Sequence, residues 1–209
     1  MSSTRPTGLP CMDAHTQTPG PDLAPAAEAV ARLIDGVRDD QLAAATPCPK
    51  YSVRELVGHI AGLTAAFTAA AHKDFGPATG TDPGSVTPVL PEDWRTGLPG
   101  RLTALAEAWR EPQAWEGDTQ AGGFTLPAAI AGVVALNELV VHGWDLSRAT
   151  GQAYDPGAAG PEAVYGFFAA NRDSALRAPA FGPVVEVPED APMLDRVVGL
   201  SGRDPGWAA

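Results

Sequence analysis

Apolar residues recur along most of this chain at the spacing of an amphipathic helix. The pattern predicts a first helix over residues 23–38 and a second over residues 52–72. The second helix has a clear start, because Ser52 and Glu55 have the spacing of a capping box, in which the hydroxyl and the carboxylate satisfy backbone amides that otherwise lack partners. Residues 76–93 are rich in glycine, proline and threonine and predict a long connection.

The second half of the chain continues the helical pattern. It predicts a third helix over residues 99–110 and a fourth that begins near Thr125–Pro127 and ends near Gly151. The fourth helix is apolar nearly all round, which is typical of a central and buried helix. Beyond it we expect a fifth helix, a short extended segment and a last helix, over residues 161–177, 184–187 and 192–200.

Neither an internal repeat nor an alternation of strands with helices is visible in the sequence. The pattern therefore predicts an all-α fold, an antiparallel four-helix bundle with extra helices and an irregular C-terminal tail. Residues 1–20 are rich in proline, serine and threonine without periodicity, so we expect a disordered leader there. Residues 21–209 are expected to form a single helical domain, because their number suits one hydrophobic core.

Composition and charge narrow the classes of protein that fit. The chain of 209 residues has 44% hydrophobic and 19% charged residues, as in soluble globular proteins. Its net charge of −11 argues against nucleic acid as a partner, because binding to phosphates needs a basic surface. The longest apolar stretch, LPAAIAGVVALNELVV, is too short and too polar to predict a membrane-spanning helix. No secretory signal is visible, so we expect a cytoplasmic protein.

The two cysteines, Cys11 and Cys48, form neither a disulfide framework nor a zinc-ribbon spacing. Cys48 lies close to the predicted start of the second helix, where a thiol can have a lowered pKa and form a mixed disulfide with a small thiol. The alternative is a small, half-buried residue in a loop bounded by prolines. The sequence favours this second interpretation.

The fourth predicted helix carries an informative set of polar residues in the segment NELVVHGWDLSRATG. Glu138 and His142 are four residues apart and therefore lie on one face of the helix. A buried carboxylate is costly unless it is paired or binds a metal, so the two predict either a metal site or a mutual hydrogen bond in the core. Asp145 continues the same face and could accept a hydrogen bond from the imidazole of His142. The alternative is a surface ion pair between Asp145 and Arg148.

His59 is the candidate for a third ligand. It lies in the middle of the second predicted helix, where Gly58 and Gly62 leave room for another helix or a ligand. Two histidines and a glutamate are a donor set of catalytic zinc sites that keep an open position. The other histidines fit less well, because His15 lies in the leader and His72 near a helix end. A hydrogen-bonded structural role for His59 is the alternative.

Three segments resemble a known family. TPCPKYSVRELVGHIAGL and ALNELVVHGWDLSRATGQ are similar to the two ligand-bearing helices of the DinB/YfiT-like metal-binding superfamily. More closely, they resemble the mycothiol-dependent maleylpyruvate isomerase N-terminal-domain family and its actinobacterial relatives. LDRVVGLSGRDP resembles the end of short, single-domain members, so the resemblance spans roughly residues 22–207.

The resemblance implies a DinB-like four-helix bundle that holds a divalent metal, usually zinc. Carried over, the family's ligands are His59, Glu138 and His142, and the resemblance also implies mycothiol as a thiol cofactor. This chain departs from the family at Lys50 and Tyr51, where many relatives have a Gly-Trp pair. The full-length isomerase also carries an additional C-terminal domain that contributes to its active site, which argues against isomerisation of maleylpyruvate itself.

A metal with three protein ligands has an open position, which is compatible with several functions. A small thiol bound there would ionise and attack a small electrophile, in S-transfer or in thiol-assisted isomerisation. Bound water would instead hydrolyse an amide or ester bond, with Asp145 managing protons. Two histidines and a carboxylate also describe the facial triad of non-haem iron oxygenases. A protein that binds metal and ligand without turnover is the remaining class.

Of these functions, we expect a metal-dependent thiol transferase or isomerase, whose partners are a small-molecule thiol and an electrophilic substrate. The sequence predicts neither the residues that bind the thiol nor a catalytic side chain beyond the metal ligands. Arg203 in SGRDP is interpreted as a surface residue paired with Asp204 or another acid, with binding of a substrate carboxylate as the alternative. We expect a monomer or a homodimer, with neither nucleic acid nor a membrane as partner.

Overall fold

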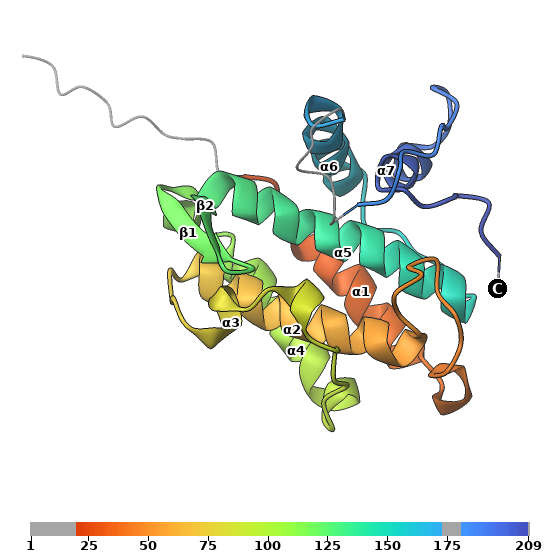
Figure 1. The fold of residues 1–209 in the computed structure, drawn as a ribbon, viewed down its shortest axis with the longest axis horizontal. Coiled ribbons are helices and arrows are strands. Elements are labelled where there is room, and N and C mark those ends of the chain that lie inside the picture. The colour runs from red at the N-terminus through yellow and green to blue at the C-terminus, as the bar shows by residue number, and fades with distance from the viewer. Residues whose placement is uncertain (1–19, 173–180, 209) are drawn as a thin grey trace, which may run out of the picture.

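The computed structural model describes residues 20–172 and 181–208, which form a helical fold with one small hairpin. Four long helices make the bundle: α1 (Ala24–Gly36), α2 (Val53–Ala71), α4 (Trp94–Ala108) and α5 (Ala128–Thr150). Helices α1 and α2 each pack against both α4 and α5 (Figure 1). The predicted all-α class and the four-helix bundle are confirmed.

The two helices that carry the candidate ligands begin and end close to their predicted limits. At the start of α2, the backbone N–H of Ser52 donates to Glu55 Oε2 at 2.8 Å, and the backbone N–H of Glu55 donates to Ser52 Oγ at 3.4 Å. The predicted capping box is therefore present. Helix α5 ends at Thr150 and is capped by Gly151, whose φ of 69° is the left-handed conformation that suits glycine after a helix.

Helix α5 lies at the centre of the molecule. Its length and composition would let it cross a membrane, but most of its apolar stretch is buried among the other helices, as in the core helix of a bundle. Its neighbours cover it from several sides, because α1, α2 and α6 (Ala159–Ala170) all pack against it. Side chains on α5 are consequently held in fixed surroundings, which matters for the candidate site.

Helix α4 begins at Trp94, five residues before the start that the pattern predicts. Pro99 lies inside the helix, where it cannot donate a backbone hydrogen bond to the preceding turn. Trp94 and Leu98 are buried against the bundle. This packing keeps the first turns helical across the proline, which local propensity alone does not predict.

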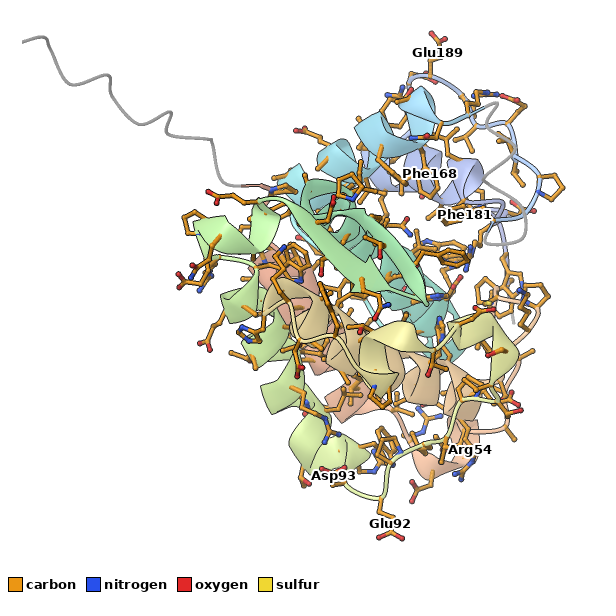
Figure 2. The ribbon with its side chains drawn as sticks, turned by 60° about the vertical axis from the view of Figure 1, so that its left-hand side comes forward. Arg54, Glu92, Asp93, Phe168, Phe181 and Glu189 are labelled. Atoms are coloured by element: carbon orange, nitrogen blue, oxygen red, sulfur yellow. The ribbon has the colours of Figure 1, made fainter. Side chains whose placement is uncertain are left out.

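The C-terminal part of the chain forms a layer on the outer side of α5. Helix α6 packs against α7 (Met193–Leu200), and the rings of Phe168 and Phe181 meet there with centroids 4.9 Å apart (Figure 2). The last predicted helix is confirmed. The fifth begins at Ala159 and ends at Ala170, and residues 173–177 of its predicted range lie outside the described part of the chain, as do residues 1–19 of the leader.

Three features differ from the sequence-based expectation. A hairpin of β1 (Asp118–Ala121) and β2 (Phe124–Pro127) precedes α5, and its turn, Gly122–Gly123, has positive φ at both residues. The pair Gly-Gly between short segments was the available signal for this turn. The connection over 76–93 contains the short helix α3 (Pro77–Gly80). Residues 184–187, predicted to be extended, form no strand within the described residues.

Short 3-10 turns complete the connections between the helices. They occur at Asp39–Gln41, Pro83–Ser85 and Pro112–Trp115.

Candidate metal centre

Packing of α2 against α5 brings together three side chains that the sequence singled out. His59 lies on α2, Glu138 and His142 lie on α5, and one donor atom of each residue lies within 4.8 Å of the others. The rings of His59 and His142 meet edge to face, with centroids 4.9 Å apart. Two ligands of one zinc ion lie at most about 4.2 Å apart, twice the usual zinc–ligand distance. A small side-chain movement therefore suffices for all three to reach one ion.

Glu138 is the acidic member of this cluster. Its Oε2 lies 3.1 Å from Nε2 of His142, and its Oε1 accepts a hydrogen bond of 3.4 Å from the side-chain amide of Asn137. Burial raises the pKa of Glu138, but the hydrogen bond and the charge of His142 outweigh burial and lower it. The carboxylate is therefore ionised at neutral pH, which is the form that binds a metal.

Asp145 orients His142 from the side opposite Glu138. Its Oδ2 lies 2.9 Å from Nδ1 of His142, and the Asp145 side chain is fully buried. The predicted contact between a carboxylate and the second nitrogen of this histidine is present. The alternative pairing of Asp145 with Arg148 is wrong, because Arg148 Nε donates to the backbone carbonyl of Trp207 at 3.1 Å.

The two carboxylates control the protonation of His142. Burial lowers the pKa of His142, but the hydrogen bonds to Asp145 and Glu138 outweigh burial and raise it to about 9. Without a metal, both ring nitrogens of His142 therefore donate at neutral pH, Nδ1 to Asp145 and Nε2 to Glu138. A metal ion would replace the proton on Nε2 and leave the contact with Asp145 intact.

His59 has the opposite environment. Burial lowers its pKa to about 4, and the charge of His142 acts in the same direction. Within residues 20–172 and 181–208, neither ring nitrogen of His59 has a hydrogen-bond partner. Its ring packs against Tyr51, with centroids 4.8 Å apart. A neutral imidazole with unpaired nitrogens beside a carboxylate has the properties of a metal ligand, whereas a hydrogen-bonded structural role has no support in this part of the chain.

Arg203 is not the surface partner of Asp204 that the sequence suggested. Its Nη2 and Nε lie 3.0 and 3.3 Å from the two carboxylate oxygens of Asp145, and 11% of its side chain is exposed. Asp204 instead accepts a hydrogen bond from the backbone N–H of Gly206. The chain turns at Gly202, with φ of 88°, and thereby brings Arg203 back toward α5. Sequence patterns do not reveal this contact between residues so far apart.

Cys48 lies beside this group of charges, in the loop before α2. Burial raises the pKa of its thiol, and the positive charge of Arg203 opposes this only in part. The thiol is therefore protonated at neutral pH, and the predicted alternative of a reactive thiolate is not supported. Cys48 is a small buried residue, and Cys11 lies outside the described residues.

The glycines beside His59 have different surroundings. A Cβ atom at Gly58 would lie 2.9 Å from the backbone of Val89, so glycine is needed there for the 76–93 connection to approach α2. Apart from the neighbouring backbone of α2 itself, no described atom lies within 4 Å of the corresponding position at Gly62. His72 is an exposed C-cap of α2, about 20 Å along the helix from His59. His15 lies outside the described residues.

Known proteins resemble this chain in sequence and in fold. Residues 23–147 match the family described as the mycothiol maleylpyruvate isomerase N-terminal domain. Two uncharacterised proteins of Mycobacterium tuberculosis, MT0763 of strain CDC 1551 and Rv0738 of strain H37Rv, are each 30% identical over 190 residues, which cover 85% of this chain and 93% of the relative. Among solved structures, a mutant of the mycothiol-dependent maleylpyruvate isomerase matches 70% of this chain and 68% of its own, with a TM-score of 0.54 and 17% identity.

Proposed function

This chain belongs to the mycothiol maleylpyruvate isomerase N-terminal domain family, and on that premise we propose that it activates a small thiol at a divalent metal. The ligands are His59, Glu138 and His142, the metal is zinc, and the thiol is mycothiol. The reaction is a thiol-dependent isomerisation of a small electrophile, or the transfer of the thiol sulfur to it. The observation that carries this proposal is the meeting of the three side chains, from two helices, within 4.8 Å.

The protonation of His59 and Glu138 supports a metal site. His59 is neutral because burial lowers its pKa to about 4, and Glu138 is ionised because His142 lowers its pKa below the usual value. Two imidazoles and one carboxylate form a zinc donor set that keeps a position open for another ligand. When bound, zinc lowers the pKa of a coordinated thiol and so supplies thiolate at neutral pH.

The residues beside His59 include a hydrogen-bond donor for a bound molecule. The ring of Tyr51 covers one side of His59 and is half-buried. Burial raises the pKa of Tyr51, so its hydroxyl keeps its proton and can donate a hydrogen bond to a bound molecule. The thiol of Cys48 is also protonated, so the nucleophile in this proposal is an external thiol.

Metal analysis of the purified protein tests the ligand set. We expect about one zinc ion per chain in the wild type, and a loss of most of the metal in His59→Ala and in His142→Ala. His72→Ala is the matched control, because it removes an exposed histidine at the C-terminal end of the same helix, far from the cluster. Full retention of zinc in both ligand variants would contradict the assignment.

Two assays test the thiol chemistry and distinguish its forms. Isomerisation regenerates the thiol, whereas S-transfer consumes one thiol for each electrophile. We expect mycothiol-dependent loss of 1-chloro-2,4-dinitrobenzene, or mycothiol-dependent cis–trans isomerisation of maleylacetone as a small model electrophile, and a rate at least 100-fold lower after chelation or in His142→Ala. Zinc-loaded protein that accelerates neither reaction would overturn the proposed activity while leaving the metal site in place.

A further inference from the structure

We infer that Arg203 is a positioning residue of the metal centre, which acts on His142 through Asp145. This inference rests on the proposed metal site and goes beyond it, because it makes the C-terminal segment after α7 part of the site. Arg203 lies 58 residues beyond Asp145 in the sequence and contacts both carboxylate oxygens. Among the described residues, the side-chain hydrogen bonds of Arg203 go to Asp145 and to the backbone carbonyl of Ser201, and none goes to a proposed ligand.

The contacts form a continuous chain of hydrogen bonds from the tail to the candidate ligand. Arg203 donates to Asp145 at 3.0 and 3.3 Å, and Asp145 accepts from Nδ1 of His142 at 2.9 Å. Nε2 of His142, on the far side of the ring, lies 3.1 Å from Glu138. The direction in which Nε2 points is therefore set by a carboxylate whose own two oxygens are held by one guanidinium group.

Burial explains why this carboxylate needs a cation. The side chain of Asp145 has no exposed surface, and an isolated carboxylate without water is costly. Among the described residues, Arg203 is the arginine that pairs with this carboxylate, and it donates to both of its oxygens. Arg203 in turn is held by the backbone carbonyl of Ser201, which accepts from Nη1 at 3.3 Å. A planar guanidinium matches the two oxygens of a carboxylate, whereas the ammonium group of lysine does not.

A purely structural role, in which Arg203 only fixes the tail, makes a different prediction. Arg148 also ties the tail to α5, because its Nε donates to the backbone carbonyl of Trp207 at 3.1 Å. Within the described part of the chain, Arg148 forms no hydrogen bond or ion pair with Asp145 or with the candidate ligands. Both arginines attach the tail to α5, but only Arg203 pairs with Asp145. Arg148→Gln is therefore the matched control for Arg203→Gln.

Zinc affinity, measured on the full chain by competition with a chromogenic chelator, is the decisive quantity. We expect Arg203→Gln to bind zinc 10-fold to 100-fold more weakly than the wild type, in line with other residues that support metal ligands. Arg203→Lys is expected to recover part of this loss, and Arg148→Gln to stay within about 3-fold of wild type. Equal affinities of Arg203→Gln and Arg148→Gln would overturn the inference.

A double-mutant cycle shows whether Arg203 acts through Asp145. In the Asp145→Asn background, Arg203→Gln should change zinc affinity by less than about 3-fold, because the carboxylate that it orients is gone. Fully additive losses would contradict the inference. The visible absorption of bound Co²⁺ provides a second readout, since its bands report ligand geometry and should change in Arg203→Gln but not in Arg148→Gln. If Arg203→Gln does not fold, Arg203→Lys carries the same comparisons.

A wild-type chain that binds neither zinc nor cobalt would overturn the proposed function together with this inference. A wild type that binds zinc normally, with Arg203→Gln unchanged, would overturn this inference alone.

Discussion

At the scale of single residues, the two histidines of the cluster have opposite protonation although they lie in contact. His142 is flanked by two carboxylates, which raise its pKa to about 9, whereas burial lowers the pKa of His59 to about 4. Both values follow from the neighbours of each ring rather than from the residue type. Without a metal, the cluster therefore holds one neutral and one protonated imidazole.

This arrangement predicts an unusual pH dependence for the metal-free protein. The pKa of His142 in the folded state is about 9, above the ordinary value of 6.5. Its contribution to stability is therefore complete below pH 6.5 and is lost as the pH rises through 9. We expect the chelated protein to lose on the order of 3 kcal/mol of unfolding free energy between these values. Urea unfolding at several pH values measures the change.

His142→Gln is the control for this prediction, because it removes the titrating group and should flatten the curve above pH 6.5. Zinc-loaded protein should respond in the opposite direction, because zinc competes with the proton on His142 and binds more tightly as the pH rises. A wild-type protein whose metal-free stability does not fall between pH 6.5 and 9 would contradict the raised pKa.

At the scale of elements, α2 presents its ligand between two glycines that have different functions. Gly58 lets the backbone of Val89 approach to within contact distance of the helix, whereas the space next to Gly62 is open. Glycine lowers the stability of a helix interior by about 1 kcal/mol relative to alanine. The close approach of Val89 explains why glycine is present at Gly58. Among the described residues, no comparable contact explains the glycine at Gly62.

This difference predicts opposite effects of the same substitution. Gly58→Ala should lower the unfolding free energy by about 1–3 kcal/mol, because the added methyl group meets backbone at Val89 that has to move. Gly62→Ala should raise the unfolding free energy by up to about 1 kcal/mol through helix propensity. Urea denaturation of both variants tests this, and equal effects of the two substitutions would show that the connection does not pack on α2 as described.

At the scale of the whole molecule, the candidate metal would join two helices that lie far apart in the sequence. His59 lies on α2, and Glu138 and His142 lie on α5, so one ion would cross-link two of the four helices of the bundle. The layer of α6, α7 and the tail adds Arg203 on the other side of α5. Metal binding should therefore stabilise the bundle as a unit rather than one loop.

The expected result is a large change in thermal stability on metal removal. At a free zinc concentration 100-fold above the dissociation constant, binding to the folded state contributes about 2.7 kcal/mol. For a chain of this length, that corresponds to a rise in Tm of about 5–10 °C. Differential scanning calorimetry with and without a chelator measures the shift. His72→Ala should keep the shift and His59→Ala should lose it, whereas an equal shift in His59→Ala would argue against a cross-link through this residue.

Local patterns predicted much of the molecule because they depend on neighbours in sequence. The helical period identified the four main helices, the Ser52–Glu55 spacing identified the start of α2, and the four-residue step placed Glu138 beside His142. The hairpin before α5 and the early start of α4 were missed. The hairpin was missed because the helical period of apolar residues does not reveal a Gly-Gly turn. The start of α4 was missed because the burial of Trp94 keeps the helix intact across Pro99.

The sequence by itself determined the class of fold, the pairing of a carboxylate with an imidazole on one helix, and the membership of a family. Only the tertiary structure decided that His59 lies beside this pair and that Asp145 accepts hydrogen bonds from Arg203 rather than from Arg148. The physical reason is distance along the chain. Spacing within a helix fixes which side chains share a face, whereas contacts between segments depend on how buried surfaces pack together.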